Sequence, residues 1–151
     1  DYSGEFKDWG KTIGDGKTWR TLSQAELIYL INNNGDENVR KGKFKYGVRV
    51  CKKANCLILA PDDFEGTIAE SYDAAAWTSA EAAGLVCLPA VGYCYGSSVS
   101  EVGNCGFYWS SSADSEYSGK ARTVYFQNRN DVDADWSDYR GLGFSVRLVT
   151  E

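Results

Sequence analysis

The sequence predicts a mixed α+β domain, and three observations lead to this class. Two segments with helix-capping residues and apolar stripes lie in the first 84 residues. Short runs with alternating apolar residues follow, separated by long stretches rich in Gly, Ser and Asp. The length of 151 residues suits one domain that buries a sizeable core, so we expect residues 1–151 to fold as a single unit.

The first helix is predicted from a capping box formed by Ser23 and Glu26. Leu22 precedes the box and is spaced to pack on the first apolar residue of the helix. The expected apolar stripe consists of Leu27, Ile28, Leu30 and Ile31. Residues 32–35, Asn-Asn-Asn-Gly, predict its end. The chain before this helix, residues 1–19, is expected to run over the surface.

A hairpin and a second helix are expected next. Residues 44–50 and 56–60 are predicted as its two strands, and the Pro-Asp-Asp turn at residue 61 stops the second. The second helix is predicted to begin at an Asp73 cap and to end at Gly84, with Thr78 as a competing later start.

The last part of the chain is predicted to hold a loop and several strands. A short buried strand over residues 85–88 ends at a proline, and residues 92–104 are predicted as a loop. Strands are then expected from residue 107, over 123–127 and over 144–149. The positions expected to face the core are Phe107, Trp109, Val124, Phe126, Phe144, Val146 and Leu148.

Charge and composition exclude several classes of function. The net charge of -5 argues against a nucleic-acid partner, although residues 40–53 hold seven basic residues and no acidic one. We interpret that run as a strand edge protected by lysines, with a basic binding patch as the alternative. No apolar run is long enough to span a membrane, and the absence of Met suggests a mature or excised segment. Histidine is absent, which removes the commonest general base and zinc ligand.

The five cysteines favour two disulfides and one buried thiol. Cys51 and Cys56 flank a predicted four-residue turn, and Cys94 and Cys105 flank the 92–104 loop, so we expect these two bridges and a free Cys87. Five reduced thiols are the alternative. None of the cysteines forms a CxxC pair, which excludes zinc-ribbon and thioredoxin motifs.

No catalytic motif is present. Residues 131–135, Asp-Val-Asp-Ala-Asp, match the start of an EF-hand loop, but Trp136 and Leu142 stand where its Gly and Glu belong. A calcium site of another type stays open, and no cofactor is predicted.

Residues 106–149 have strand-like ends and a middle composed mainly of Ser, Asp, Asn, Gly, Tyr and Arg. This composition is typical of adaptable binding surfaces, in which aromatic rings give contact area and small polar groups give hydrogen bonds. The alternative interpretation is a polar, solvated loop.

Six phrases in the sequence, in this order, resemble the Fibrobacter succinogenes major paralogous domain of secreted and surface proteins of gut bacteria. They are the phrases at residues 8–10, 18–22, 57–63, 84–92, 108–112 and 143–149. The resemblance implies a C-type lectin-like fold of the formylglycine-generating-enzyme branch. It also implies a target protein of a diversity-generating retroelement, with residues 106–149 as the variable region.

The amino acids in the middle of this region are similar to those that the mutated codons of such retroelements encode. An AAC codon mutated at its adenines can encode every residue from Asn128 to Leu142 except Trp136. Lys120 and Gln127 cannot be encoded by such a codon either. The catalytic cysteine pair of the enzyme branch has no counterpart here, and neither do the sugar-binding motifs of calcium-dependent lectins. By the same resemblance, Cys94 and Cys105 stand where the family has other residues.

Three functions therefore compete: a binding module with a diversified surface, a structural domain of a surface lipoprotein or pilus, and an enzyme of the related branch. We favour the binding module, with no enzymatic activity and a protein or glycan ligand on another cell or surface. The expected location is extracellular or at the cell surface, or on a phage particle. The predicted ligand-binding residues are expected to be mostly exposed and gathered on one face; they are Tyr117, Arg122, Tyr125, Gln127, Arg129, Asn130, Asp133, Asp135, Trp136, Asp138 and Tyr139.

Overall fold

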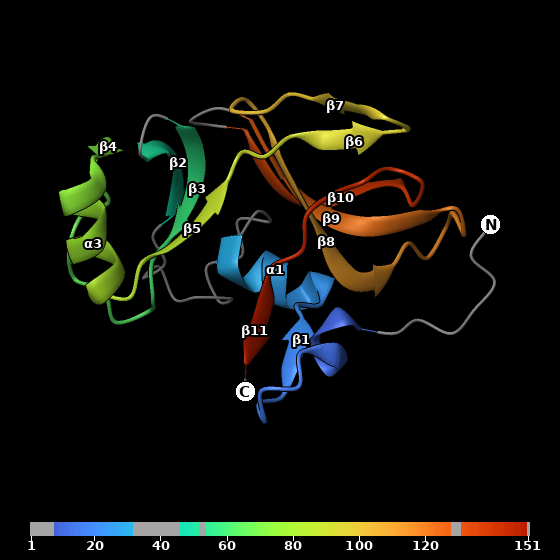
Figure 1. The fold of residues 1–151 in the computed structure, drawn as a ribbon, viewed down its shortest axis with the longest axis horizontal. Coiled ribbons are helices and arrows are strands. Elements are labelled where there is room, and N and C mark those ends of the chain that lie inside the picture. Colours follow the sequence, from blue (N-terminus) through green and yellow to red (C-terminus); the bar gives the residue numbers. More distant parts are fainter. Residues whose placement is uncertain (1–7, 32–45, 52–53, 128–130, 151) are drawn as a thin grey trace.

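The computed structural model describes residues 8–31, 46–51, 54–127 and 131–150 (Figure 1). Helix α1 (Gln24–Ile31) lies at the centre of the molecule, and α3 (Ala74–Ala82) lies at one end. Between and around them are short strands, nearly all antiparallel, in four small sheets. This arrangement confirms the predicted α+β class for the described part of the chain.

Helix α1 begins at the predicted capping box. The backbone N–H of Ser23 donates to the Glu26 carboxylate at 2.8 Å, and the Glu26 N–H donates to the Ser23 hydroxyl at 3.3 Å. Arg20 also donates to both Glu26 oxygens, at 2.9 and 2.6 Å, and these bonds lower the pKa of Glu26 to about 2. The helix presents Leu27 and Ile31 to the core, as its apolar stripe predicts. The predicted helix end at residues 32–35 lies outside the described residues.

The N-terminal segment of the described chain forms the short 3-10 helix η1 (Trp9–Thr12) and β1 (Trp19–Thr21). The buried Asp8 carboxylate joins the two, because it accepts hydrogen bonds from the N–H of Gly10 at 3.0 Å and of Thr21 at 2.8 Å. Strand β1 then pairs antiparallel with β11 (Leu148–Thr150), near the C-terminal end. This pair brings two distant parts of the sequence together below α1 in Figure 1.

A four-stranded sheet separates α1 from α3. In spatial order its strands are β4 (Ser71–Tyr72), β2 (Tyr46–Cys51), β3 (Ala54–Leu59) and β5 (Val86–Pro89). The predicted hairpin is present as β2 and β3, but with different bounds, since β3 begins at Ala54, which pairs with Cys51, and not at Cys56. Strands β2 and β4 are parallel and the other neighbours are antiparallel.

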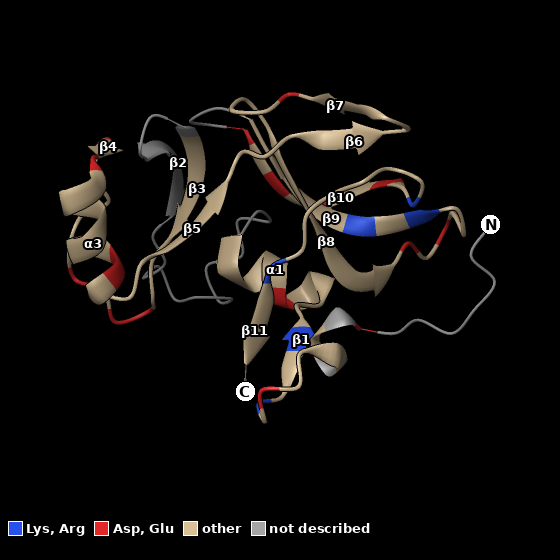
Figure 2. Cartoon of the chain, viewed as in Figure 1, with Lys and Arg blue, Asp and Glu red and all other residues tan. Residues whose placement is uncertain are grey.

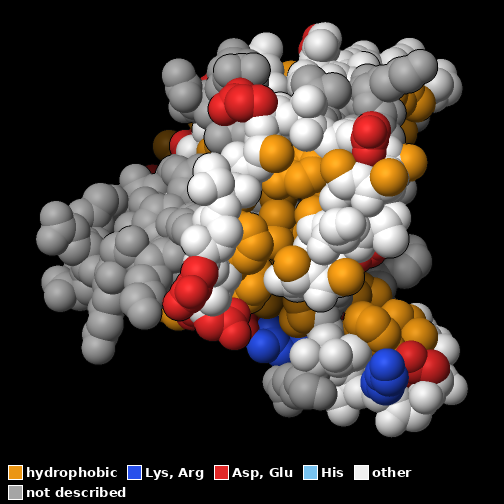
Figure 3. Space-filling model, turned by 90° about the vertical axis from the view of Figure 1, so that its left-hand side faces the viewer, with side chains coloured by type: hydrophobic (Ala, Val, Ile, Leu, Met, Phe, Trp, Pro, Cys, Tyr) orange, Lys and Arg blue, Asp and Glu red, His pale blue; other side chains and the backbone are white. Residues whose placement is uncertain are grey.

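Strand β3 is apolar at every position from Cys56 to Leu59 because both of its faces are covered. Leu57 packs in the main core beside α1, whereas Ile58 packs in a second cluster that contains Tyr72 and Trp77. The rings of Tyr72 and Trp77 meet edge to face, with centroids 5.6 Å apart. Figure 3 views the end of the molecule that carries α3 and shows apolar side chains gathered in a furrow there.

Helix α3 confirms the predicted start at Asp73, whose carboxylate accepts a hydrogen bond from the Ala76 N–H at 2.8 Å. The competing start at Thr78 is wrong, because Thr78 lies inside the helix and donates to the Ala74 carbonyl. Within the described part of the chain, no helix combines the length and apolar character that crossing a membrane requires.

The predicted loop over residues 92–104 contains a hairpin instead, formed by β6 (Tyr93–Tyr95) and β7 (Ser98–Ser100). Its turn is Gly96-Ser97, and Gly96 has a φ of 58°, which glycine adopts without strain and two-residue hairpins require. The prediction of a loop was wrong because it relied on the high content of small residues and gave too little weight to this turn signal.

Strands β8 (Gly106–Ala113), β9 (Lys120–Phe126) and β10 (Val132–Tyr139) form a three-stranded antiparallel sheet with β9 in the centre. The sequence predicted the first two strands, although both are longer or earlier than expected. It treated β10 as part of a polar middle segment. The closing strand over 144–149 is confirmed only at its end, as β11, because residues 143–145 form single bridges to Cys94 and Tyr108.

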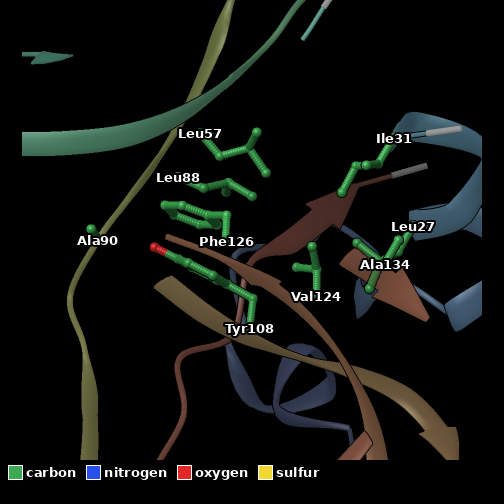
Figure 4. Close-up of a cluster of buried hydrophobic side chains, with 9 residues drawn as sticks. All are labelled: Leu27, Ile31, Leu57, Leu88, Ala90, Tyr108, Val124, Phe126 and Ala134. Atoms are coloured by element: carbon green, nitrogen blue, oxygen red, sulfur yellow. The ribbon is translucent and has the colours of Figure 1, made fainter. Parts of the chain in front are cut away.

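The main core lies between α1 and the inner face of this sheet (Figure 4). Val124 and Phe126 are fully buried there, which confirms the predicted phase of β9. The phase of β8 was wrong: its register places Tyr108 opposite Val124, so Tyr108 enters the core while Phe107 and Trp109 face the other side, half-buried. Phe144 and Leu148 are also half-buried, and Val146 is exposed, because only part of the closing segment is a strand.

Candidate functional site

A cleft of about 700 Å³ lies between the β6–β7 hairpin and the outer face of the three-stranded sheet. Aromatic side chains form most of its wall, together with two carboxylates and two serines. Its lining residues are Tyr93, Tyr95, Ser98, Ser100, Phe107, Tyr125, Asp131, Trp136, Asp138, Leu142 and Phe144. We call this the aromatic cleft.

The alternation of side chains along the strands builds one wall of the aromatic cleft. Phe107 on β8 lies opposite Tyr125 on β9, so both point away from the core. Their ring centroids are 4.9 Å apart. On β10, a bulge between Asp133 and Trp136 inserts one extra residue, and this returns Trp136 to the outer face beside Tyr125, at a centroid distance of 5.9 Å.

Phe144 closes the inner end of the aromatic cleft. Its ring stacks on Phe107 at 4.6 Å and on Trp109 at 4.4 Å, and it meets Tyr93 edge to face at 6.3 Å. The flanking residues are held by backbone hydrogen bonds on both sides. Gly143 exchanges two with Cys94, at 2.9 and 2.8 Å, and Ser145 exchanges two with β8, at 2.9 and 3.1 Å. The floor of the cleft is therefore fixed to both the hairpin and the sheet.

This arrangement requires a residue without a side chain at position 143. A Cβ atom at Gly143 would lie 2.8 Å from the Cβ of Cys94, closer than side chains approach in proteins. The hairpin can therefore approach residues 143–145 closely enough to form the two backbone hydrogen bonds. Gly143 belongs to the phrase at 143–149 that the sequence analysis singled out.

The hydroxyl of Tyr125 lies among polar groups at the edge of the cleft. It is 2.8 Å from Oε1 of Gln127 and 3.5 Å from the Asp131 carboxylate. Burial, followed by the neighbouring Cys105 thiol and Asp131, raises the pKa of Tyr125 to about 12. Tyr125 therefore stays protonated at neutral pH and acts as a hydrogen-bond donor.

The charged groups of the aromatic cleft are acidic. Asp131 and Asp138 line it, whereas no lysine or arginine does so among the described residues. Strands β6 and β7 carry no charged residue, as Figure 2 shows. The basic residues of β9, Lys120 and Arg122, are in phase with Val124 and Phe126 and point to the opposite face.

The predicted ligand-binding residues do not share one face. Tyr125, Trp136 and Asp138 line the aromatic cleft, and Gln127 is exposed beside it. Asp133 is half-buried and accepts a hydrogen bond from the Asp135 N–H at 2.7 Å. Arg129 and Asn130 lie outside the described residues.

Arg122 and Asp135 belong to a network on the opposite side, at the start of α1. Arg122 is 3.3 Å from the carboxylate of Asp114 and 3.0 Å from that of Asp135. Asp135 also accepts a hydrogen bond from the side-chain amide of Gln24. Asp114 accepts two backbone N–H bonds, and these lower its pKa. This network links β9 and β10 to α1, so we interpret it as structural.

Tyr117 and Tyr139 form a third group, at the turn between β8 and β9. Both are exposed, and the Lys120 ammonium lies over both rings, 5.4 Å from the centroid of Tyr117 and 5.1 Å from that of Tyr139. Their distance from the cleft comes from register, since Tyr139 pairs with Lys120 at the far end of the sheet.

The two predicted disulfides are absent. Cys94 and Cys105 are unbridged thiols, because they face different elements: Cys94 lies against Gly143, and the Cys105 thiol lies 3.7 Å from the Glu101 carboxylate. Burial and Glu101 raise the pKa of Cys105. Cys56 is also a thiol, and it lies opposite Arg49 and not Cys51, because Cys51 pairs with Ala54 at the start of β3.

A metal site is not found in the described residues, in which no group of three or more Cys, Asp or Glu side chains converges. The acidic run at 131–135 is divided among separate partners. Asp131 is beside Tyr125, Asp133 bonds to the backbone, and Asp135 pairs with Arg122. This arrangement does not support the open possibility of a calcium site there.

A second cavity, of about 510 Å³, has a mainly apolar lining that also includes Asp62 and Arg147. It lies between α1, the β3–β5 pair and residues 147–150. Helix α1 leads directly from it into residues 32–45, which the structure does not describe. The aromatic cleft gathers six aromatic side chains beside two carboxylates, and Tyr95 and Trp136 among them are exposed, so it is the better candidate for a site.

Sequence reasoning missed the residues that the hairpin contributes to the cleft, Tyr93 and Tyr95, and the outward direction of Phe107 and Phe144. The Tyr-Cys-Tyr-Gly-Ser-Ser-Val-Ser run at 93–100 is a hairpin signal, with aromatic residues on either side of a cysteine before a Gly-Ser turn. Reading it as a hairpin would have placed the half-buried Tyr93 and the exposed Tyr95 beside the final strands.

Comparison with known proteins gives one family. Residues 30–149 match the family described as "Domain of unknown function (DUF8237)". No curated protein and no solved structure matches the chain. The matched range includes every strand that lines the aromatic cleft. Because the match covers most of its length, the chain belongs to the DUF8237 family.

Proposed function

We propose that this chain is a ligand-binding domain and that the aromatic cleft is its binding site. The observation that carries the proposal is the cleft itself, where six aromatic side chains line a single cavity beside two carboxylates. Several of these rings are accessible: Tyr95 is 72% exposed and Trp136 is 45% exposed. Tryptophan and tyrosine are the residues most often found as energetic anchors of interfaces.

The scaffold of this domain is, in our proposal, C-type lectin-like, of the formylglycine-generating-enzyme branch. The resemblance to the Fibrobacter succinogenes major paralogous domain supports this, as does the pairing of β1 with β11 near the two ends of the described chain. The same resemblance leads us to propose residues 106–149 as a region diversified by a retroelement. This region supplies seven of the residues that line the cleft: Phe107, Tyr125, Asp131, Trp136, Asp138, Leu142 and Phe144.

Binding without catalysis fits the chemistry of the cleft. The chain contains no histidine, so the serines and the Cys105 thiol near its two carboxylates lack the commonest general base. We propose a protein or glycan ligand on another cell or surface, and an extracellular, cell-surface or phage location. Because the described cysteines form no disulfide, the location rests on the resemblance and not on the redox state.

The binding proposal is tested by capture. The purified chain and its Trp136→Ala and Tyr95→Ala variants are immobilised and exposed to arrays of glycans and of surface proteins. We expect the wild type to capture a ligand that both variants lose, with unchanged melting temperatures. Ligand capture that survives both substitutions would place the site elsewhere, and no capture at all would favour a structural domain of a surface protein.

The retroelement proposal has a separate test at the gene. We expect a reverse-transcriptase gene nearby, together with a near-copy of the codons for residues 106–149 that differs at adenines. A locus with neither feature would contradict diversification, while the binding proposal would remain to be judged by capture.

A further inference from the structure

We propose that the aromatic cleft accepts a cationic side chain, a lysine or arginine, from a protein partner. The inference rests on the proposed binding function of the same cleft and adds the chemical class of the group that it binds. Three features of the described residues carry it: the aromatic wall, the two carboxylates, and the lack of a basic residue among the lining.

The aromatic wall offers ring faces to an incoming cation. Tyr125 and Trp136 are tilted by 38° to each other, and Trp136 is 45% exposed. Across the cleft, Tyr95 on the hairpin is exposed. A cation within about 6 Å of such ring centroids is attracted by their quadrupoles, most strongly by tryptophan.

The carboxylates add charge complementarity. Asp131 is exposed, Asp138 is half-buried, and neither forms an ion pair with any described residue. Among the described residues, Asp138 accepts only the Tyr139 N–H, through Oδ1 at 2.8 Å, which leaves its other oxygen available to them. Two carboxylates at the edge of an aromatic wall, neither paired with a described basic residue, favour a cation over a neutral group, and the net charge of -5 acts in the same direction.

The chain itself shows how its aromatic rings hold a lysine. At the far end of the sheet, Lys120 lies over both Tyr117 and Tyr139, within 5.4 Å of each centroid. The rings of the aromatic cleft have no such cation among the described residues. Lys120 and its two rings form a complete cation–aromatic contact, whereas the described part of the cleft supplies aromatic and acidic groups and no basic one.

The test compares three probes that differ in charge. They are a capped tripeptide with a central lysine, the same tripeptide with norleucine, which keeps the methylenes and lacks the ammonium, and a neutral methyl glycoside. Binding to the full chain is followed by NMR, using the indole N–H of Trp136, assigned from a Trp136→Phe sample. We expect the lysine peptide to bind about tenfold more tightly than the norleucine peptide.

Charge-removing variants complete the test. The double variant Asp131→Asn, Asp138→Asn is expected to weaken the lysine peptide about fivefold and to leave the norleucine peptide unchanged. Asn retains an oxygen for the Tyr139 N–H, so folding should be preserved, and unchanged melting checks this. Asp63→Asn, an exposed carboxylate in the turn after β3, is the matched control and should change neither affinity.

The outcomes separate this inference from the proposed function. Equal binding of the lysine and norleucine peptides, or binding of the glycoside alone, overturns the cationic ligand and leaves the cleft as a binding site. Failure of all three probes to shift the Trp136 signal, up to their solubility limits, also overturns it. If, in addition, captured ligands ignore Trp136→Ala, the cleft is not the binding site and both proposals fall.

Discussion

The two faces of the β8–β9–β10 sheet are made by alternate residues of the same strands, yet they differ in burial and in the kinds of side chain that they carry. The inner face completely buries Val124 and Phe126 against α1. The outer face leaves Trp136 45% exposed and gathers aromatic rings beside carboxylates. The comparison shows how one sheet can carry a buried core on one side and an exposed aromatic surface on the other, because each strand position belongs to only one face.

The largest expected effect tests the inner face. Phe126→Ala removes a fully buried ring that stacks on Tyr108, and should lower the free energy of unfolding by about 3–5 kcal/mol. Urea denaturation measures this change. Tyr117→Ala, which removes a ring that is 60% exposed, is the control and should change stability by about 0.5 kcal/mol or less. Similar losses in the two variants would remove the distinction between the faces.

The next prediction concerns the close approach of Phe126 to β8. A Cβ at Gly106 would collide with the Phe126 ring, whereas nothing lies within 4 Å of one at Gly119. Gly106→Ala should therefore destabilise the fold by about 1–3 kcal/mol through overpacking, and Gly119→Ala should not. Thermal melting compares the two variants. A Gly106→Ala protein as stable as the wild type would show that the ring moves aside freely.

On the outer face, Trp136→Ala should change binding and not folding. Stability should stay within about 0.5–1 kcal/mol of the wild type, because the side chain is partly exposed, while binding should weaken by about 2 kcal/mol. Tyr139→Ala is the control at the far end of the sheet, where the sequence also predicted a ligand contact. Equal losses of captured ligand in both variants would extend the site beyond the aromatic cleft, and unfolding of Trp136→Ala would make the residue part of the scaffold.

Local signals in the sequence predicted much of the fold. The caps at Ser23 and Asp73 mark where α1 and α3 begin, since each side chain accepts a hydrogen bond from the backbone N–H three residues later. The unbroken apolar run of β3 and the alternation in β9 likewise predicted burial correctly. In these segments the residue pattern alone decides the structure.

The candidate site could not be predicted from the periodicity of apolar residues, because it depends on a bulge, on cross-strand register and on a long-range contact. The bulge in β10 shifts the phase by one residue, so alternation counted from Val132 would place Trp136 on the core side. In β8, cross-strand register decides that Tyr108, and not Phe107, faces inward. The cleft also needs the β6–β7 hairpin, whose approach to Gly143 joins segments about fifty residues apart. Tyr125 and Trp136 could be predicted as surface aromatics, but not as neighbours.

The smallest expected effect concerns α1, which covers the inner face. Arg20 and the Ser23 N–H stabilise the charged form of Glu26, so its pKa falls from 4.5 to about 2 on folding. A lowered pKa means that this contribution is complete above pH 4.5 and is lost as the pH falls from 4.5 towards 2. The carboxylate and Arg20 are each more than a third exposed, so solvent screening limits the contribution to about 1 kcal/mol or less. In urea denaturation across this pH range, Glu26→Gln should flatten the decline in stability, and the exposed control Glu65→Gln should keep the wild-type slope. A Glu26→Gln protein with the wild-type slope would show that the start of α1 does not depend on this charge.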